Sequence, residues 1–155
     1  VEVAVAELPP EKPRYLMGVG SPEDLVEGVA RGIDLFDSAL PTRVGRNGGL
    51  YTSQGRIDIT SPLYRERPGP VEEGCPCYTC RNFSAAYLHH LFRSGELLAL
   101  RLATLHNLTF YMGLMEKMRQ AIVEGNFSRF RQEFRARYRP TDEGARLAQR
   151  RLWQG

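Results

Sequence analysis

Residues 32–48 read GIDLFDSALPTRVGRNG, and this stretch decides which fold the rest of the chain can adopt. Ile33, Leu35 and Phe36 form a short apolar run that predicts one buried strand, which ends at the carboxylate of Asp37. A buried strand that presents an acid at its carboxyl end is how α/β barrels and open α/β sheets position catalytic groups. The alternative is an ordinary aspartate that caps a turn after the strand.

A loop rich in arginine and glycine is expected after Pro41. The loop carries Arg43 and Arg46, and guanidinium groups bind phosphate in a bidentate way. Gly45 and Gly48 would let the backbone approach a partner closely. An acid at the end of a strand, beside a basic loop, indicates chemistry on a nucleotide.

The bulk composition places the chain in a broad class. Its 155 residues are enough for one domain with a hydrophobic core, but not for two large domains. With 42% hydrophobic and 25% charged residues, it is typical of a soluble globular protein. No apolar run approaches the roughly 20 residues that cross a bilayer, and no basic and then apolar leader opens the sequence. We therefore expect a cytoplasmic protein.

Charge is unevenly distributed, although the formal net charge is only +3. Between residues 127 and 153, Glu133, Asp142 and Glu143 are outnumbered by eight arginines: Arg129, Arg131, Arg135, Arg137, Arg139, Arg146, Arg150 and Arg151. Such a basic end can hold a polyanion or can be a solvated helix face. The three cysteines are an odd number, which argues against a closed disulfide framework.

The first part of the chain predicts a strand–helix–strand unit. Residues 1–13, rich in proline at their end, form a linker-like lead-in, and residues 15–19 read as a short buried strand. Ser21 caps a helix with proline at its first position and acids in its first turn, and Gly32 ends it. With residues 33–36 as the next strand, the short crossover implies a parallel pair.

The pattern changes after the acid at the strand end. Residues 38–80 contain several glycines and prolines, and short alternating segments at 50–52 and 56–59 indicate small antiparallel strands. Ser84 is expected to cap a short helix, which residues 94–95 (Ser-Gly) end.

A long helix is predicted over residues 96–124, with Thr104 as the candidate start of a second segment. Its apolar stripe consists of Leu98, Leu102, Leu105, Leu108, Met112 and Met115. A final amphipathic helix is marked by Phe127, Phe130, Phe134 and Tyr138. We interpret both stripes as core rather than as ligand-binding surfaces.

A cluster of thiols predicts a metal site. Residues 75–80, CPCYTC, contain Cys75, Cys77 and Cys80. Zinc prefers four tetrahedral sulfur and nitrogen ligands, so a fourth donor is expected elsewhere. The candidates are His89, His90 and His106. Four protein ligands would leave no open position for water, so the zinc would be structural. The alternative is three reduced cysteines that share no ligand.

Several segments together resemble the C-terminal part of one family, the bacterial tRNA-guanine transglycosylases. They are residues 16–28 (LMGVGSPEDLVEG), 32–48, 75–80 and 104–107 (TLHN), and the resemblance extends from about residue 13 to residue 138. It implies an α/β fold: the C-terminal portion of a TIM (β/α)8 barrel with a zinc-binding insertion and C-terminal helices. The expected division is a lead-in at 1–13, the last two barrel strands and their helix at 14–37, a basic loop and zinc-binding subdomain at 38–95, C-terminal helices at 96–138 and a basic tail at 139–155.

The family exchanges guanine at the anticodon wobble position of certain tRNAs for a 7-deazaguanine precursor of queuosine. The resemblance implies that Asp37 is the nucleophile, which attacks C1′ of the ribose and leaves a covalent glycosyl-enzyme. It matches Arg43 and Arg46 to a basic segment that grips the tRNA anticodon loop. Three residues match positions that line the base pocket: Tyr15, Met17 and Gly18.

The same resemblance assigns the ligands of one structural Zn²⁺ to Cys75, Cys77, Cys80 and His106. It places a homodimer contact at Phe83, Tyr87 and His90. The implied partners are therefore a tRNA anticodon loop, a 7-deazaguanine base and, for the full-length protein, a second copy, with no membrane.

A complete TIM barrel needs about 250 residues and eight strands, whereas this chain resembles only the last two. The family's second catalytic aspartate, its general acid/base, is expected upstream of this segment. We therefore expect the chain alone to be inactive in base exchange and to expose a strand edge and apolar faces. The alternatives are a zinc-stabilised RNA-binding module and a non-catalytic accessory subunit, although the latter would have no use for Asp37.

Overall fold

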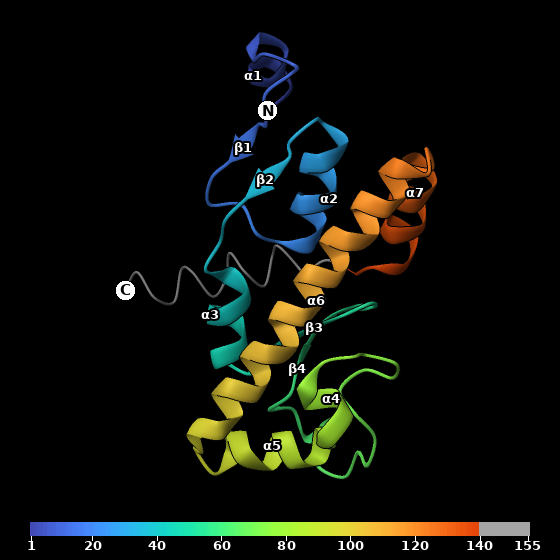
Figure 1. Ribbon diagram of the computed structural model, residues 1–155. Helices are drawn as coiled ribbons and strands as arrows, with labels where there is room; N and C mark the ends of the chain where they lie inside the picture. The colour runs from blue at the N-terminus through green and yellow to red at the C-terminus, as the bar shows by residue number, and fades with distance from the viewer. Residues whose placement is uncertain (140–155) are drawn as a thin grey trace.

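The computed structural model describes residues 1–139. Beyond its first residue, the expected basic tail lies outside the described residues, and with it Arg146, Arg150 and Arg151. The described elements are α1 (Glu2–Glu7), β1 (Tyr15–Leu16), α2 (Pro22–Ala30), β2 (Leu35–Phe36), α3 (Leu40–Arg46), β3 (Gly49–Thr52), β4 (Gly55–Asp58), a 3₁₀ turn (Pro62–Tyr64), α4 (Tyr78–Asn82), α5 (Ala85–Arg93), α6 (Leu97–Val123) and α7 (Phe127–Arg137). Helix α6 connects the two ends of the molecule: α2, α7 and the β1–β2 pair lie at one end, and α4 and α5 lie at the other (Figure 1). Among these helices none is both long enough and apolar enough to span a membrane.

The expected strand–helix–strand unit is present, with β1 parallel to β2 in the register Tyr15↔Leu35. Helix α2 begins as predicted: the Ser21 hydroxyl accepts a hydrogen bond from the Asp24 amide, and Pro22 lies in the first turn. The strands are shorter than predicted, and they are not buried, because Tyr15 is 51% and Leu35 is 53% exposed. Parallel sheets are normally covered on both faces. In the described part of the chain this sheet has only two strands, so both are edges.

Two segments that were expected to be irregular are helical. The lead-in at residues 1–13 contains α1, so it is not an uninterrupted linker. The prediction of a loop after Pro41 is wrong, because α3 begins at Leu40 and carries Arg43 and Arg46 in its last turn. Proline is tolerated in the first turn of a helix, where its missing N–H would have no intrahelical partner. The proline therefore marks the start of a helix rather than a break.

The small antiparallel strands are confirmed as β3 and β4, which pair in the register Leu50↔Ile57. Leu50 is completely buried between this hairpin and the helices. The short helix α5 is also confirmed, with the Ser84 hydroxyl accepting a hydrogen bond from the Tyr87 amide as its N-cap. The hairpin and α5 thus form one packed unit with the middle of α6.

Helix α6 is uninterrupted, so the second segment expected at Thr104 does not exist. Its predicted apolar stripe is only partly core, since Leu102 is buried while four other members are 36% to 69% exposed: Leu98, Leu105, Leu108 and Met112. The buried face instead includes alanines and two polar side chains, His106 and Asn107. The prediction missed this face because it considered only large apolar residues.

Two hydrophobic clusters form the core along α6. One joins α2 and α7 to α6 through Val26, Met118 and Phe134, and the other joins the hairpin and α5 to α6 through Leu50 and Leu88. Phe134 belongs to the aromatic stripe that was predicted for the last helix, and the remaining members of that stripe pack in or against the first cluster. This part of the prediction is confirmed.

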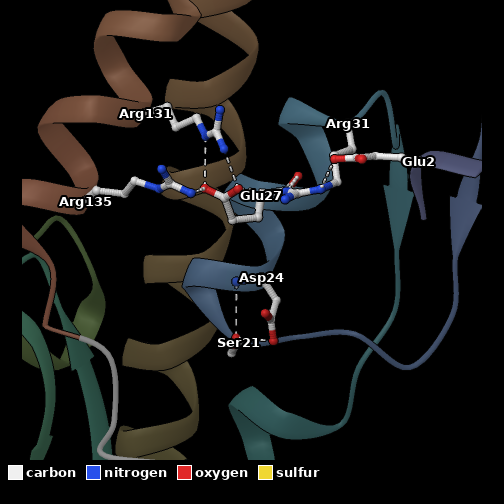
Figure 2. Close-up of polar contacts among 7 residues, drawn as sticks. All are labelled: Glu2, Ser21, Asp24, Glu27, Arg31, Arg131 and Arg135. Atoms are coloured by element: carbon white, nitrogen blue, oxygen red, sulfur yellow. Dashed lines mark hydrogen bonds and ion pairs between the residues drawn. The ribbon is translucent and has the colours of Figure 1, made fainter.

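Ion pairs also fasten α7 to α2 (Figure 2). Both oxygens of Glu27 accept hydrogen bonds from Arg131, at 2.9 Å from Nε and 2.6 Å from Nη2. Arg135 Nη2 lies 2.7 Å from Glu27 Oε1, and Arg31 Nη1 lies 2.7 Å from Glu27 Oε2. The hydrogen bonds from Arg131, supported by Arg31 and Arg135, hold the pKa of Glu27 at about 2.

Candidate active site and metal centre

Asp37 follows β2 directly, and its carboxylate is held at the ends of both strands. Asp37 Oδ1 accepts a hydrogen bond from the Tyr15 hydroxyl at 2.7 Å and another from the Gly18 amide at 3.1 Å. Gly18 has a φ of +72°, a conformation that glycine adopts readily and that other residues rarely do. The structure therefore brings two residues of the predicted base pocket into contact with the predicted nucleophile.

The environment of Asp37 keeps it ionised. The Tyr15 hydrogen bond is the largest cause that lowers the pKa of Asp37, and the Gly18 amide lowers it further. The same contact raises the pKa of the Tyr15 hydroxyl. The Asp37 side chain is also exposed. An ionised, accessible carboxylate with a fixed orientation has the properties that a carboxylate nucleophile needs.

Asp37 lines a cavity of about 570 Å³ beyond the carboxyl ends of β1 and β2. Arg43 from α3 and Arg56 from β4 line the same cavity, and Arg56 was not predicted. A Cβ on Gly20 would lie 2.2 Å from the Cβ of Ser38, so a glycine is needed where the loops after the two strands meet. The cavity thus combines one oriented acid and two arginines from separate elements with Glu23 and Asp24 of α2.

Two of the residues that were expected to bind substrate, Met17 and Arg46, do not line this cavity. Met17 is 71% exposed, and Arg46 is exposed on α3. Neither belongs to the cavity wall that the described residues form. The residues that the structure does bring together are Asp37, Tyr15, Gly18 and Arg43.

Helix α3 holds Arg43 in place because it lies directly against α6. Gly45 makes this close approach feasible, since a Cβ at that position would lie 3.3 Å from the backbone carbonyl of Ala103. The glycine was expected to let the backbone approach a partner. The structure shows that the partner is another helix of the same chain.

Asn107 on α6 ties α3 to the hairpin. Its Nδ2 donates to the Pro41 carbonyl at 2.9 Å and to the Gly49 carbonyl at 3.0 Å, and its Oδ1 accepts from the Tyr51 amide at 3.0 Å. The side chain is completely buried. The role of Asn107 was not predicted, although a polar His106-Asn107 pair inside a long apolar helix was a signal for it.

A second site lies where the thiol cluster meets α6. The structure brings together Cys75, Cys77, Cys80 and His106, and their ligand atoms all lie within 4.8 Å of one another. His106 Nδ1 lies 3.8, 3.5 and 3.4 Å from the three sulfurs in chain order. A tetrahedral ion with sulfur ligands at about 2.3 Å and nitrogen at about 2.0 Å would separate sulfur from nitrogen by about 3.5 Å. These four residues therefore fit a tetrahedral metal ion.

Hydrogen bonding selects His106 from the three candidate histidines. Its Nε2 lies 2.8 Å from the Tyr51 carbonyl, so Nε2 donates a hydrogen bond and Nδ1 faces the thiols, where it can bind a metal ion. His89 is buried elsewhere, with Nδ1 at 2.8 Å from the Ile59 carbonyl, and His90 is exposed. The structure thus brings His106, the ligand that the resemblance implies, to the three thiols.

The thiol segment is anchored independently of any ion. Cys77 is the N-cap of α4, and its sulfur accepts a hydrogen bond from the Cys80 amide at 3.2 Å. The Thr79 hydroxyl donates to the Leu102 carbonyl of α6 at 2.7 Å. A hydrogen bond from the Cys80 thiol lowers the pKa of Cys77, and the same contact raises the pKa of Cys80. A bound dication would displace the proton that these sulfurs share.

An aromatic surface cluster lies next to this site, at the position expected for the homodimer contact. The rings of Phe83 and Tyr87 stack at 5.4 Å between centroids, and Tyr78 contacts Phe83 edge-on at 5.8 Å. Tyr78 is 58% and Tyr87 is 40% exposed, and His90 is exposed on the same helix as Tyr87. The three residues expected at the contact thus lie near one another on α5 and the end of α4.

The chain is similar to known proteins over most of its length. A family model described as queuine tRNA-ribosyltransferase matches residues 1–140. The queuine tRNA-ribosyltransferase of Dehalococcoides mccartyi is 53% identical over 146 residues, which are 94% of this chain and 37% of that protein. That of Dictyoglomus turgidum is 51% identical over 153 residues, covering 99% of this chain and 39% of the relative. That of Francisella tularensis is 53% identical over 133 residues, covering 86% and 36%. The chain thus spans less than two fifths of the length of these relatives, and it belongs to the queuine tRNA-ribosyltransferase family.

Proposed function

We propose that this chain is the part of a tRNA-guanine transglycosylase that supplies the catalytic nucleophile, arginines that bind tRNA and a structural zinc site. The observation that carries the proposal is the Asp37 carboxylate, which ends β2 and is oriented by the Tyr15 hydroxyl and the Gly18 amide. Membership of the family supports it, because the relatives bear the name of this activity.

In the proposed reaction Asp37 attacks C1′ of the guanosine ribose. Both hydrogen bonds from described residues fall on Oδ1, which leaves Oδ2 to form the bond. The electron pair of the glycosidic bond leaves with guanine, which takes a proton from a general acid elsewhere in the complete enzyme. The incoming 7-deazaguanine base then attacks C1′, loses a proton and displaces the carboxylate. Two inversions give net retention, as in retaining glycosidases.

The neighbouring residues take roles that suit their chemistry. Arg43 and Arg46 contact backbone phosphates of the anticodon loop, because guanidinium groups bind phosphate oxygens in pairs. Tyr15, Met17 and Gly18 form one wall of the base pocket, and the thioether of the methionine packs on the flat face of the purine.

The metal is proposed to be one Zn²⁺ ion held by Cys75, Cys77, Cys80 and His106. Three sulfurs and one imidazole nitrogen are a preferred zinc donor set, and the spacing of the four atoms suits tetrahedral coordination. When bound, the ion cross-links the thiol segment to α6. It leaves no open position for substrate, so its role is structural.

The complete protein is proposed to form a homodimer through Phe83, Tyr87 and His90, whose exposed aromatic surface is of a kind that is enriched at interfaces. Its place of action is the cytoplasm, where its tRNA substrate resides.

The test is Asp37→Asn in a complete enzyme that contains this segment. The amide cannot form the ester with ribose, so the covalent RNA adduct on denaturing gels and the exchange of labelled guanine should both disappear. Binding of tRNA should survive, which distinguishes a lost nucleophile from a lost fold. Exchange activity that persists in the variant would refute the assignment and favour a non-catalytic RNA-binding module.

A further inference from the structure

We propose that Arg56 is a second phosphate-binding residue of the candidate active site, which contacts the RNA backbone beside the nucleotide that Asp37 attacks. The inference rests on the proposed function and adds a contact from an element that none of the recognised motifs includes. Arg56 lies on β4, directly opposite Tyr51 of β3 in the hairpin.

Arg56 and the proposed nucleophile line one cavity. Arg43 lines the same cavity of about 570 Å³, although the three residues come from β4, the end of β2 and α3. A nucleotide inside an RNA strand carries a phosphate on each side of its ribose. One cavity with a ribose-directed carboxylate and two arginines therefore matches one nucleotide with its two flanking phosphates.

A glycine makes room for the guanidinium. A Cβ on Gly49 would lie 2.7 Å from Arg56 Nε and 2.9 Å from Arg56 Nη2, so the guanidinium lies over the bare backbone of this residue. The same Cβ would lie 2.5 Å from Cγ1 of Val44, which adjoins Arg43 on α3. The side chain of Arg56 is thus directed along the hairpin toward Val44 of α3.

Three carboxylates and two guanidinium groups line the cavity: Asp37, Glu23, Asp24, Arg43 and Arg56. Asp37 accepts two hydrogen bonds, Asp24 accepts one from the Ser21 hydroxyl at 2.6 Å, and Glu23 is not free either. Among residues 1–139, neither Arg43 nor Arg56 forms an ion pair. Exposed guanidinium groups without an internal carboxylate are suited to an external anion.

The test measures binding of a fluorescently labelled anticodon stem-loop RNA to the full 155-residue chain by anisotropy, over about 50 to 300 mM KCl. Arg56→Gln keeps most of the aliphatic stem and removes the charge. We expect it to weaken binding several-fold at low salt and to reduce the slope of log affinity against log salt by about 0.7 to 0.9, the value for one phosphate contact. The matched control is Arg101→Gln, an exposed arginine on α6 outside this cavity, which should leave both quantities unchanged.

A second variant separates phosphate binding from packing. Arg56→Lys retains the charge, so a phosphate contact predicts a salt slope like that of the parent chain. A packing role instead predicts that Arg56→Gln and Arg56→Lys both lower the affinity for RNA. Parent-like binding by Arg56→Gln, equal losses from Arg101→Gln, or no binding by the parent chain at low salt would each overturn the inference. Failure of the proposed function is seen separately, as base exchange that persists in Asp37→Asn.

Discussion

The ion pairs around Glu27 predict a measurable contribution to stability. Three guanidinium groups, those of Arg31, Arg131 and Arg135, converge on this one carboxylate and connect α2 with α7 (Figure 2). They lower the pKa of Glu27 from 4.5 to about 2. At about 1.4 kcal/mol per pKa unit, this difference corresponds to an upper limit of about 3 kcal/mol. The Glu27 side chain is 23% and that of Arg135 58% exposed, so solvent screening should reduce the effect to about 1 to 2 kcal/mol.

The assay is urea unfolding of the chain and its Glu27→Gln variant, followed by circular dichroism at several pH values. Because the pKa of Glu27 is lower in the folded chain, its contribution is complete above the unfolded value of about 4.5 and is lost as the pH falls toward 2. The difference in unfolding free energy should therefore be about 1 to 2 kcal/mol near pH 7 and should shrink steadily below pH 4.5.

The matched control is Glu133→Gln on α7. Glu133 pairs with Arg129 at 2.8 Å, but the two side chains are 62% and 80% exposed. Exposed pairs of this kind contribute little, so we expect a change below about 0.5 kcal/mol. Equal effects from the two substitutions, or a Glu27 effect that does not depend on pH between 7 and 3, would refute the reasoning.

Two further predictions concern α6. Asn107→Ala should cost about 2 to 4 kcal/mol in urea unfolding, because it removes three buried hydrogen bonds, including the one to the Tyr51 amide; a loss below about 1 kcal/mol would contradict the assigned hydrogen bonds. His106→Ala should lower the zinc content from about one ion per chain, measured by elemental analysis, while His90→Ala should not; equal zinc in both variants would place the fourth ligand elsewhere.

Local signals in the sequence were sufficient wherever a structural element is decided by its immediate neighbours. Ser21 with the following proline marked the start of α2, and Ser84 marked the start of α5, because capping hydrogen bonds join residues three apart. Pro41 was misread, since the same residue either breaks a helix or begins one, and the preceding residues decide which.

Features that depend on distant residues were beyond local reasoning. Asn107 contacts residues that lie 56 to 66 positions away, so its role cannot be read from its neighbours in the sequence. The cluster of thiols predicted a metal site, but only the resemblance to a family selected His106 from three histidines. Arg56 belonged to a short strand without a motif, and its place beside Asp37 follows from the packing of the hairpin on α6.

The adjacent residues His106 and Asn107 bind both backbone polar groups of a single residue of β3, Tyr51. The imidazole donates to the carbonyl of Tyr51, and the amide oxygen accepts from its N–H. Tyr51 lines the cavity of Asp37 and pairs across the hairpin with Arg56. An ion bound to His106 would therefore restrain the backbone of Tyr51, which lies in the wall of the Asp37 cavity. Removal of the ion with a chelator should therefore loosen the position of Tyr51 beside Asp37, even while the helices remain intact.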